Sequence, residues 1–326
     1  MAFYGGTVAA LGGALFWPRG LDLRDGRHDR RHNGLWLQHG WLGDDLWFSL
    51  NDREHLKAEL RAEASVVALR ARLDEHGIRD VFPHLCPAQP DGSLLPVDRA
   101  ATKRFLSVMA GKRVMPWIGG VLGSSAQPHE ARWRKSFVAS AVALLRRFPE
   151  FAGVHLNIEP CPSGHAGYLA LLDELRAALP EGKLLSVAAF APPSLLHPFD
   201  DVHWSEAYYR EVARRAQQLV PMLYDTSLHF VMPYRGLVKS WAKEVLAWSE
   251  GSEVLLGLPA FDDRGVGYHD PDVECLEHAL AGVHGALHEL ESVPPSYRGV
   301  ALYADWTMND AKWRVFAERF ADPSTR

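Results

Sequence analysis

Short apolar runs alternate with amphipathic stretches along the chain from Gly34 onward. Turn-forming residues flank each run, a pattern typical of buried β-strands. Between the runs, apolar residues recur at a helical spacing, which predicts helices that each bury one face. The expected strands are Leu35–Trp41, Arg79–Leu85, Arg113–Gly119, Gly153–Glu159, Leu184–Phe190, Leu219–Tyr224, Val254–Pro259 and Val300–Tyr303. The expected helices are His55–His76, Ala101–Met109, Ala131–Arg147, Gly167–Leu179, Ser205–Gln218, Tyr234–Trp248, Asp270–Leu290 and Asp310–Phe320.

Eight strands that alternate with eight helices predict one closed parallel (β/α)8 barrel, a TIM barrel, over residues 34–326. An open, doubly wound sheet is the competing α/β fold. It requires a glycine-rich phosphate-binding turn after the first strand, and Gly40-Trp41-Leu42-Gly43 is not such a turn. For the helix after the seventh strand, Asp270-Pro271 is a favourable start, because a capping Asp precedes a Pro in the first turn.

The amino terminus carries a separate signal. Residues 2–18 are apolar or small throughout, about the minimum length that spans a bilayer. The stretch lacks the basic start of a signal peptide, and its four glycines disfavour a soluble helix. Two interpretations stay open: a degenerate signal or membrane anchor, which implies the cell envelope or secretion, and a disordered start, which fits a cytoplasmic protein. Residues 19–33 are rich in Arg, Asp and His, and we expect a polar linker there.

Composition and charge narrow the class of partner. The chain has 326 residues with 35 Lys and Arg against 40 Asp and Glu, a formal charge of −5. This slight acidity argues against nucleic-acid binding, which usually needs a basic surface. Three cysteines, Cys86, Cys161 and Cys275, are too few for a disulfide framework. We expect a monomer whose core is large enough to fold without a structural metal.

The fourth expected strand carries the clearest chemistry. Side chains alternate faces along a strand, so Val154, Leu156 and Ile158 form one row and His155, Asn157 and Glu159 the other. The apolar row suits the outer helices, and the polar row must then point into the barrel. Glu159 ends the strand at the face where barrel enzymes hold their active sites. A carboxyl group in a partly apolar cavity has a raised pKa, which suits a general acid, whereas a structural alternative pairs Glu159 with a buried cation.

The same segment resembles a known signature. Residues 152–159 are similar to Asp-Gly-x-Asp-x-Asp-x-Glu of the family 18 glycoside hydrolases, the chitinase group, whose final Glu is the catalytic acid. Met222-Leu223-Tyr224-Asp225 resembles that family's Met-x-Tyr-Asp, whose Tyr and Asp contact the N-acetyl group and the reacting sugar. Residues 256–261 are similar to its seventh strand, and Tyr303 or Trp306 falls where an aromatic residue floors the sugar site. The resemblance implies a substrate-assisted retaining hydrolase of glycans that contain N-acetylhexosamine, with Glu159, Asn157, Tyr224 and Asp225 catalytic and no cofactor.

Departures from the signature leave alternatives open. Ala152, His155 and Asn157 replace the family's aspartates. The amide of Asn157 can still hydrogen-bond an acetamido group, but it cannot ionise; such an Asn-x-Glu pair resembles the family 85 endo-β-N-acetylglucosaminidases. A degenerate barrel that binds glycans without cutting them is one alternative. A second is a two-carboxylate mechanism that uses Asp225 or Asp262.

Metal-dependent hydrolysis is the remaining alternative. Sixteen histidines are present, and His39, His84 and His155 lie near strand ends, but no His-x-His follows the first strand and no His-Glu-x-x-His occurs. We therefore expect no metal. Eleven Trp residues favour a carbohydrate ligand, because indole rings stack on the apolar faces of sugars. The expected substrate-binding residues are His155, His84, Trp117, Trp41, Tyr303, Trp306 and Asp262.

Overall fold

The computed structural model of this chain describes residues 23–321. Within them, nine parallel strands form one sheet in the order β3-β2-β1-β9-β8-β7-β6-β5-β4. The strands are β1 (Asn33–Leu37), β2 (Ile78–Pro83), β3 (Arg113–Val114), β4 (Trp117–Val121), β5 (Gly153–Glu159), β6 (Leu184–Ala189), β7 (Gln218–Pro221), β8 (Glu253–Pro259) and β9 (Tyr297–Tyr303). The predicted α/β TIM barrel is thereby confirmed.

The two outermost strands of this order are halves of one predicted strand. Met115-Pro116 separates β3 from β4, because a proline lacks the N–H that a ladder needs. Hydrogen bonds nevertheless continue past the break, from Met115 N–H to the Val81 carbonyl and from Leu85 N–H to the Trp117 carbonyl. On the other side, His155 N–H donates to the Pro116 carbonyl. The interrupted strand therefore joins β2 to β5 and closes the ring.

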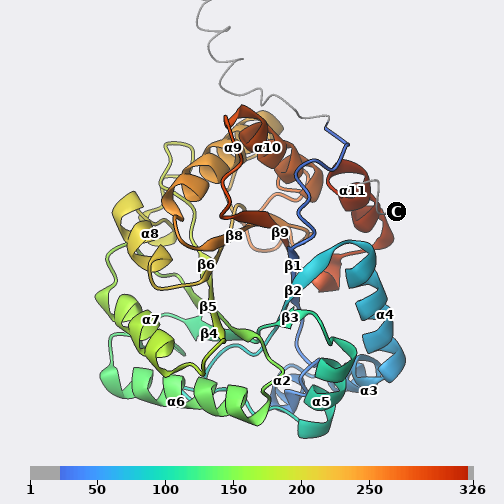
Figure 1. The fold of residues 1–326 in the computed structure, drawn as a ribbon, viewed down its shortest axis with the longest axis vertical. Helices are drawn as coiled ribbons and strands as arrows, with labels where there is room; N and C mark the ends of the chain where they lie inside the picture. Colours follow the sequence, from blue (N-terminus) through green and yellow to red (C-terminus); the bar gives the residue numbers. More distant parts are fainter. Residues whose placement is uncertain (1–22, 322–326) are drawn as a thin grey trace, which may run out of the picture.

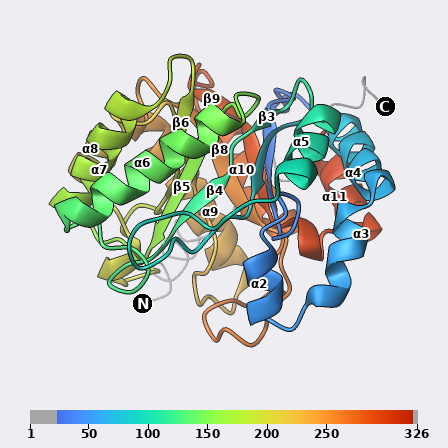
Figure 2. The same cartoon turned by 90° about the horizontal axis from the view of Figure 1, so that it is seen from below.

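Helices surround this sheet as an outer layer (Figures 1 and 2). In the described residues they are α2 (Asp45–Leu50), α3 (Lys57–Arg61), α4 (Glu63–Glu75), α5 (Arg99–Val108), α6 (Ala131–Arg147), α7 (Ala166–Ala178), α8 (Glu206–Ala213), α9 (Val231–Trp248), α10 (Leu276–Glu289) and α11 (Asp310–Arg319). Short 3-10 turns lie at Glu54–Leu56, Asp200–Val202 and Asp305–Thr307. The apolar row of β5 packs under these helices in the main core, whereas Trp36, Phe82 and Met115 belong to a second cluster.

The helices differ from the prediction in several places. The helix expected over His55–His76 is divided at Ala62, whose extended backbone separates α3 from α4. Helix α2 was not expected, and the helix expected over Ser205–Gln218 ends at Ala213, because Gln218 already belongs to β7. Helix α10 begins at Leu276: Asp270 does start a helical turn, in which the Glu274 N–H donates to the Asp270 carbonyl, but the extended backbone of Cys275 separates that turn from the helix.

The apolar stretch 2–18 and most of the polar linker lie outside the described residues. Among residues 23–321, every helix is too short or too polar to cross a membrane.

Candidate active site

The polar row of β5 points into the barrel, as its alternation predicts. His155 contacts the rings of Trp36 and Phe82, members of the inner cluster. Asn157 follows, 8% exposed, and Glu159 reaches solvent at the strand's end. Gly119 on β4 makes this arrangement possible, because a Cβ there would lie 1.8 Å from the Asn157 carbonyl oxygen. A side chain at position 119 would therefore displace β5 at the site.

His155 is a structural residue and not the ligand contact that we expected. It is fully buried, and burial lowers its pKa to about 3, so the ring is neutral. Its Nε2 accepts from the Trp36 indole N–H (3.0 Å), and its Nδ1 donates to the Ser186 hydroxyl (2.8 Å). Ser186 in turn donates to Gln218 (2.6 Å). Both ring nitrogens are therefore used inside the barrel, below the candidate site.

Seven of the predicted residues come together at the carboxyl end of the barrel. They line a cavity of about 240 Å³: Trp117, Asn157, Glu159, Tyr224, Asp225, Tyr303 and Trp306. Tyr224 and Tyr303 stack with ring centroids 5.5 Å apart, and Trp306 meets Tyr303 edge-on at 5.4 Å. The cavity thus combines aromatic rings with the carboxyl groups of Glu159 and Asp225.

Glu159 brings to this cavity a carboxyl group whose pKa is raised. Enclosure by the cavity walls raises its pKa, and the negative charge of Asp225 raises it further. The amide of Asn157 opposes this, because its Nδ2 donates to Glu159 Oε1 at 2.5 Å. The Oδ1 of the same amide is buried and has no hydrogen-bond partner among the described residues. The site therefore combines an acid, Glu159, with a hydrogen-bond acceptor, Asn157 Oδ1, that has no donor among the described residues.

A second cavity of about 730 Å³ adjoins the first. Both are lined by Glu159, Met222, Tyr224, Asp225 and Tyr268, so the two spaces meet at the acid. The walls of the second are mostly apolar, and His197 and His203 contribute polar atoms. These two rings lie 2.7 Å apart (Nδ1 to Nε2), and His197 Nε2 donates to the Asp225 carbonyl at 3.0 Å. The acid thus lies between a small aromatic space and a wider apolar one.

Three other predicted residues do not line either cavity. His84 packs between His39 and Trp117, and its Nδ1 accepts from the Cys86 backbone N–H. Trp41 is buried in the main core. Asp262 turns outward to an ion pair with Lys312 at 2.6 Å. Its neighbour Asp263 lines the smaller cavity, so a one-residue shift along the loop decides which carboxyl group faces inward.

Several lining residues were missed from sequence. For the smaller cavity they are Trp36, Met222, Phe261, Asp263, Val266, Tyr268 and Thr307. The period-two pattern of β1 was available to place Trp36 in the interior. Asp263, Val266 and Tyr268 lie in the loop after β8, where no periodicity exists. Only the tertiary structure brings that loop over the barrel mouth.

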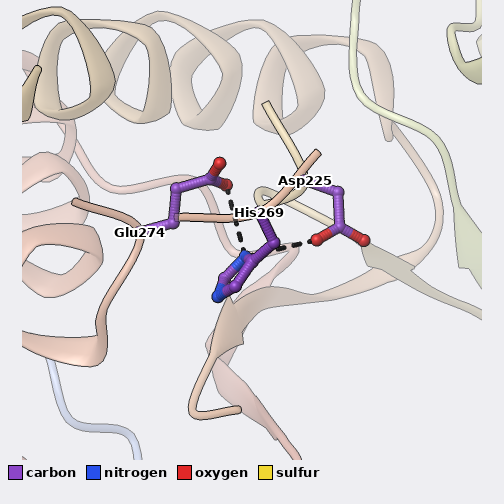
Figure 3. A group of neighbouring side chains, drawn as sticks. All are labelled: Asp225, His269 and Glu274. Atoms are coloured by element: carbon purple, nitrogen blue, oxygen red, sulfur yellow. Dashed lines mark ion pairs between the residues drawn. The ribbon is translucent and has the colours of Figure 1, made fainter. Parts of the chain in front are cut away.

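One group of side chains in the described residues has metal-ligating chemistry. Ligand atoms of Asp225, His269 and Glu274 all lie within 4.8 Å of one another (Figure 3).

The two cysteines near the barrel mouth are poor nucleophiles. Cys86 and Cys161 are buried, and burial raises the pKa of both thiols, that of Cys161 to about 12. Neither cysteine therefore has the thiolate character of a nucleophile.

Solved structures of SleL and of several chitinases are similar in fold to this chain. The spore cortex-lytic enzyme SleL of Bacillus cereus is similar, with a TM-score of 0.58 and 12% identity over 89% of this chain and 74% of that one. A chitinase from Chromobacterium violaceum has a TM-score of 0.54 and 16% identity, over 77% of this chain and 94% of its own. A chitinase from Bacteroides thetaiotaomicron has a TM-score of 0.54 and 11% identity, over 90% and 98%.

No family model and no curated protein matches this sequence. At these low identities, the structural likeness shows the fold alone. The chain shares its TIM-barrel-like fold with chitinases. One of them, ChiB of Flavobacterium johnsoniae, belongs to family 18, whose signature the β5 segment resembles. What it does with that fold depends on the site itself.

Proposed function

We propose that this protein hydrolyses a glycan that contains N-acetylhexosamine, by a substrate-assisted, retaining mechanism. The observation that carries the proposal is the amide of Asn157. Its Nδ2 holds Glu159, and its buried Oδ1 has no partner among the described residues. Buried acceptors are rarely left unpaired, and the N–H of an acetamido group is the donor that would fit. Similarity to chitinases and to SleL supports a carbohydrate substrate.

The residues divide the reaction between them. Glu159 donates its proton to the glycosidic oxygen, while the acetamido carbonyl oxygen attacks the anomeric carbon and the bond to the leaving group breaks. Asn157 holds the acetamido N–H, and Asp225 lies near the positive charge that develops on the resulting oxazolinium ring. A water molecule then attacks the anomeric carbon and gives its proton to the Glu159 carboxylate. Two displacements at one carbon retain its configuration.

In this proposal, each of the two cavities holds one part of the substrate. The reacting sugar fits the smaller cavity, where Trp117, Tyr303 and Trp306 offer rings to its apolar face. Burial raises the pKa of Tyr224 well above its usual value, so its hydroxyl remains a hydrogen-bond donor. The leaving group extends from Glu159 into the wider cavity. No cofactor takes part in this scheme.

Fluorogenic substrates test the proposal directly. We expect release of 4-methylumbelliferone from β-N-acetylglucosaminides of one or two sugars, and none from the matching glucosides, which lack the acetamido nucleophile. A thiazoline that mimics the bicyclic intermediate should inhibit. Comparable cleavage of the glucosides would support a two-carboxylate mechanism instead. Binding of acetamido sugars without turnover would make the protein a glycan-binding barrel and reject hydrolysis.

Replacing Asn157 with aspartate should shift the basic limb of the kcat/KM profile to higher pH. A second carboxylate in contact with Glu159 disfavours ionisation of the acid by like charge, and it removes the amide that now lowers the Glu159 pKa. Glu159 would then stay protonated to higher pH. The basic limb of kcat/KM should move up by about one pH unit or more. A profile that keeps its basic limb in place would show that Asn157 does not contact the acid in solution.

A further inference from the structure

Asp225 sits on an unusual stretch of backbone. It follows β7 with φ +61°, and Ser227 has φ +56°, both in the left-handed region that non-glycine residues rarely adopt. Such a conformation persists only where surrounding contacts hold it. The Ser227 N–H donates to the Tyr268 carbonyl at 2.9 Å, so a hydrogen bond to the loop between β8 and α10 stabilises this backbone.

The same loop supplies a buried imidazole and a buried carboxyl group. His269 Nδ1 lies 3.3 Å from Asp225 Oδ1 and 3.8 Å from Glu274 Oε2, and both side chains from the loop are fully buried. Figure 3 shows His269 between the two carboxyl groups, with one oxygen of Asp225 directed at the ring and the other directed away. A carboxylate oxygen accepts hydrogen bonds and donates none, so the contact between Nδ1 and Asp225 is stabilising when Nδ1 carries the hydrogen.

Further contacts lock this arrangement in place. Both oxygens of Glu274 lie 3.0 Å from the backbone N–H of Thr226, the residue next to Asp225. The ring of His269 stacks on Phe261 at 3.8 Å, and Phe261 packs edge-on against Tyr224. Glu274 therefore holds the backbone beside Asp225 while His269 faces its side chain.

We propose that His269 is a positioning residue for Asp225, and that Glu274 holds it in that role. The inference rests on the proposed function. His269 Nδ1 lies 3.3 Å from Asp225 Oδ1 without a hydrogen bond of normal geometry, and a small rotation of the ring lets Nδ1–H donate to that oxygen, which leaves the other oxygen for the positive charge that forms on the substrate. Asn157, next to the acid, cannot ionise, so Asp225 is the carboxylate beside Glu159 that can balance this charge. If the Asp225 side chain were free to rotate, it would stabilise this positive charge poorly.

Two substitutions of His269 separate a positioning role from simple packing. His269→Leu keeps the bulk and removes the donor, and we expect kcat for an N-acetylglucosaminide to fall 10- to 100-fold with KM changed less than about threefold. His269→Asn places an amide N–H near the position of Nδ1 and should recover most of kcat. Glu274→Gln, which still offers an oxygen to Thr226, should lower kcat several-fold.

A matched control comes from the neighbouring surface. His229 also faces an aspartate, with Nδ1 3.5 Å from Asp270, but its side chain is 75% exposed. His229→Leu should behave as the unaltered protein does. Thermal unfolding of every variant shows whether it is folded. A folded His269→Leu protein with unchanged kcat would overturn the proposal. Loss of activity on chelation, restored by Zn²⁺, would do so as well, since the three side chains would then be metal ligands.

Nuclear magnetic resonance separates this inference from the proposed function. The proposed function fails if no acetamido sugar is turned over, yet the imidazole can still be observed. We expect an ¹⁵N-bound proton on Nδ1 that is absent in His269→Leu and shifts in Asp225→Asn. An Nδ1 without hydrogen would refute the positioning role whatever the enzyme's activity.

Discussion

Glutamine in place of Glu159 is expected to reduce kcat/KM for an N-acetylglucosaminide with a sugar leaving group by a factor of about 10³. General acid–base catalysis contributes roughly 10²- to 10⁴-fold, and here one carboxyl group must both protonate the leaving oxygen and later deprotonate water. The amide of glutamine can do neither. Steady-state hydrolysis of an acetylated chito-oligosaccharide, followed by product chromatography, measures the loss.

Leaving groups of different basicity make this test specific. An aryl leaving group departs with little protonation, so its release should suffer less from Glu159→Gln than release of a sugar. Binding of an acetamido sugar, measured by calorimetry, should survive because the cavity keeps its shape. Glu206→Gln is a suitable control, since Glu206 is exposed on α8 and pairs with Arg210. An equal and small loss for both leaving groups would assign the acid to another residue.

The largest expected effect on stability comes from Arg113→Ala. Arg113 at the amino end of the barrel holds Asp80, which is fully buried, through Nε at 2.7 Å and Nη2 at 2.5 Å. It also donates to Glu253 at 2.7 Å. Removing the cation leaves a buried carboxylate without its counter-charge. Loss of one partner of such a pair costs about 3–5 kcal/mol of unfolding free energy.

Urea denaturation measures this loss of unfolding free energy, and Arg298 provides a matched control. Arg298 also reaches Glu253, at 3.2 Å, but it is 40% exposed, so Arg298→Ala should cost less than about 1 kcal/mol. Because removing both buried charges relieves the penalty, Arg113→Met combined with Asp80→Leu should recover most of the lost stability. A single Arg113→Ala variant as stable as the Arg298→Ala variant would contradict the account.

Local pattern was sufficient for most of the fold. The strand over Gly153–Glu159 and the helix over Ala131–Arg147 have the predicted bounds, because each has a regular apolar face and clear turn signals. The alternation along β5 also predicts that Asn157 and Glu159 point inward. The prediction failed at the start of α10, where Asp270 begins one helical turn but the backbone becomes extended at Cys275, next to Glu274, whose carboxyl group accepts from the distant Thr226 N–H. A local preference yields when a distant contact stabilises another conformation more.

The candidate site was predictable only where strands end. Glu159 and Tyr303 end strands, Tyr224 and Asp225 lie in the loop just after β7, and parallel strands bring such positions together. His155 was placed on the correct face but at the wrong depth, since sequence does not show that Trp36 and Ser186 take both its ring nitrogens. Asp262 was preferred to Asp263 because a loop has no period from which to infer direction.

By itself, the sequence determined the TIM barrel, the polar row of β5 and the acid at its tip, because these follow from hydrophobic periodicity within a few neighbouring residues. Only the tertiary structure decided which residues surround that acid. The contact between Asp225 and His269 joins two loops far apart in the chain, and so does the cavity that Asp263 and Tyr268 help to close. Such contacts depend on how loops fold over the barrel mouth, and no local pattern encodes that packing.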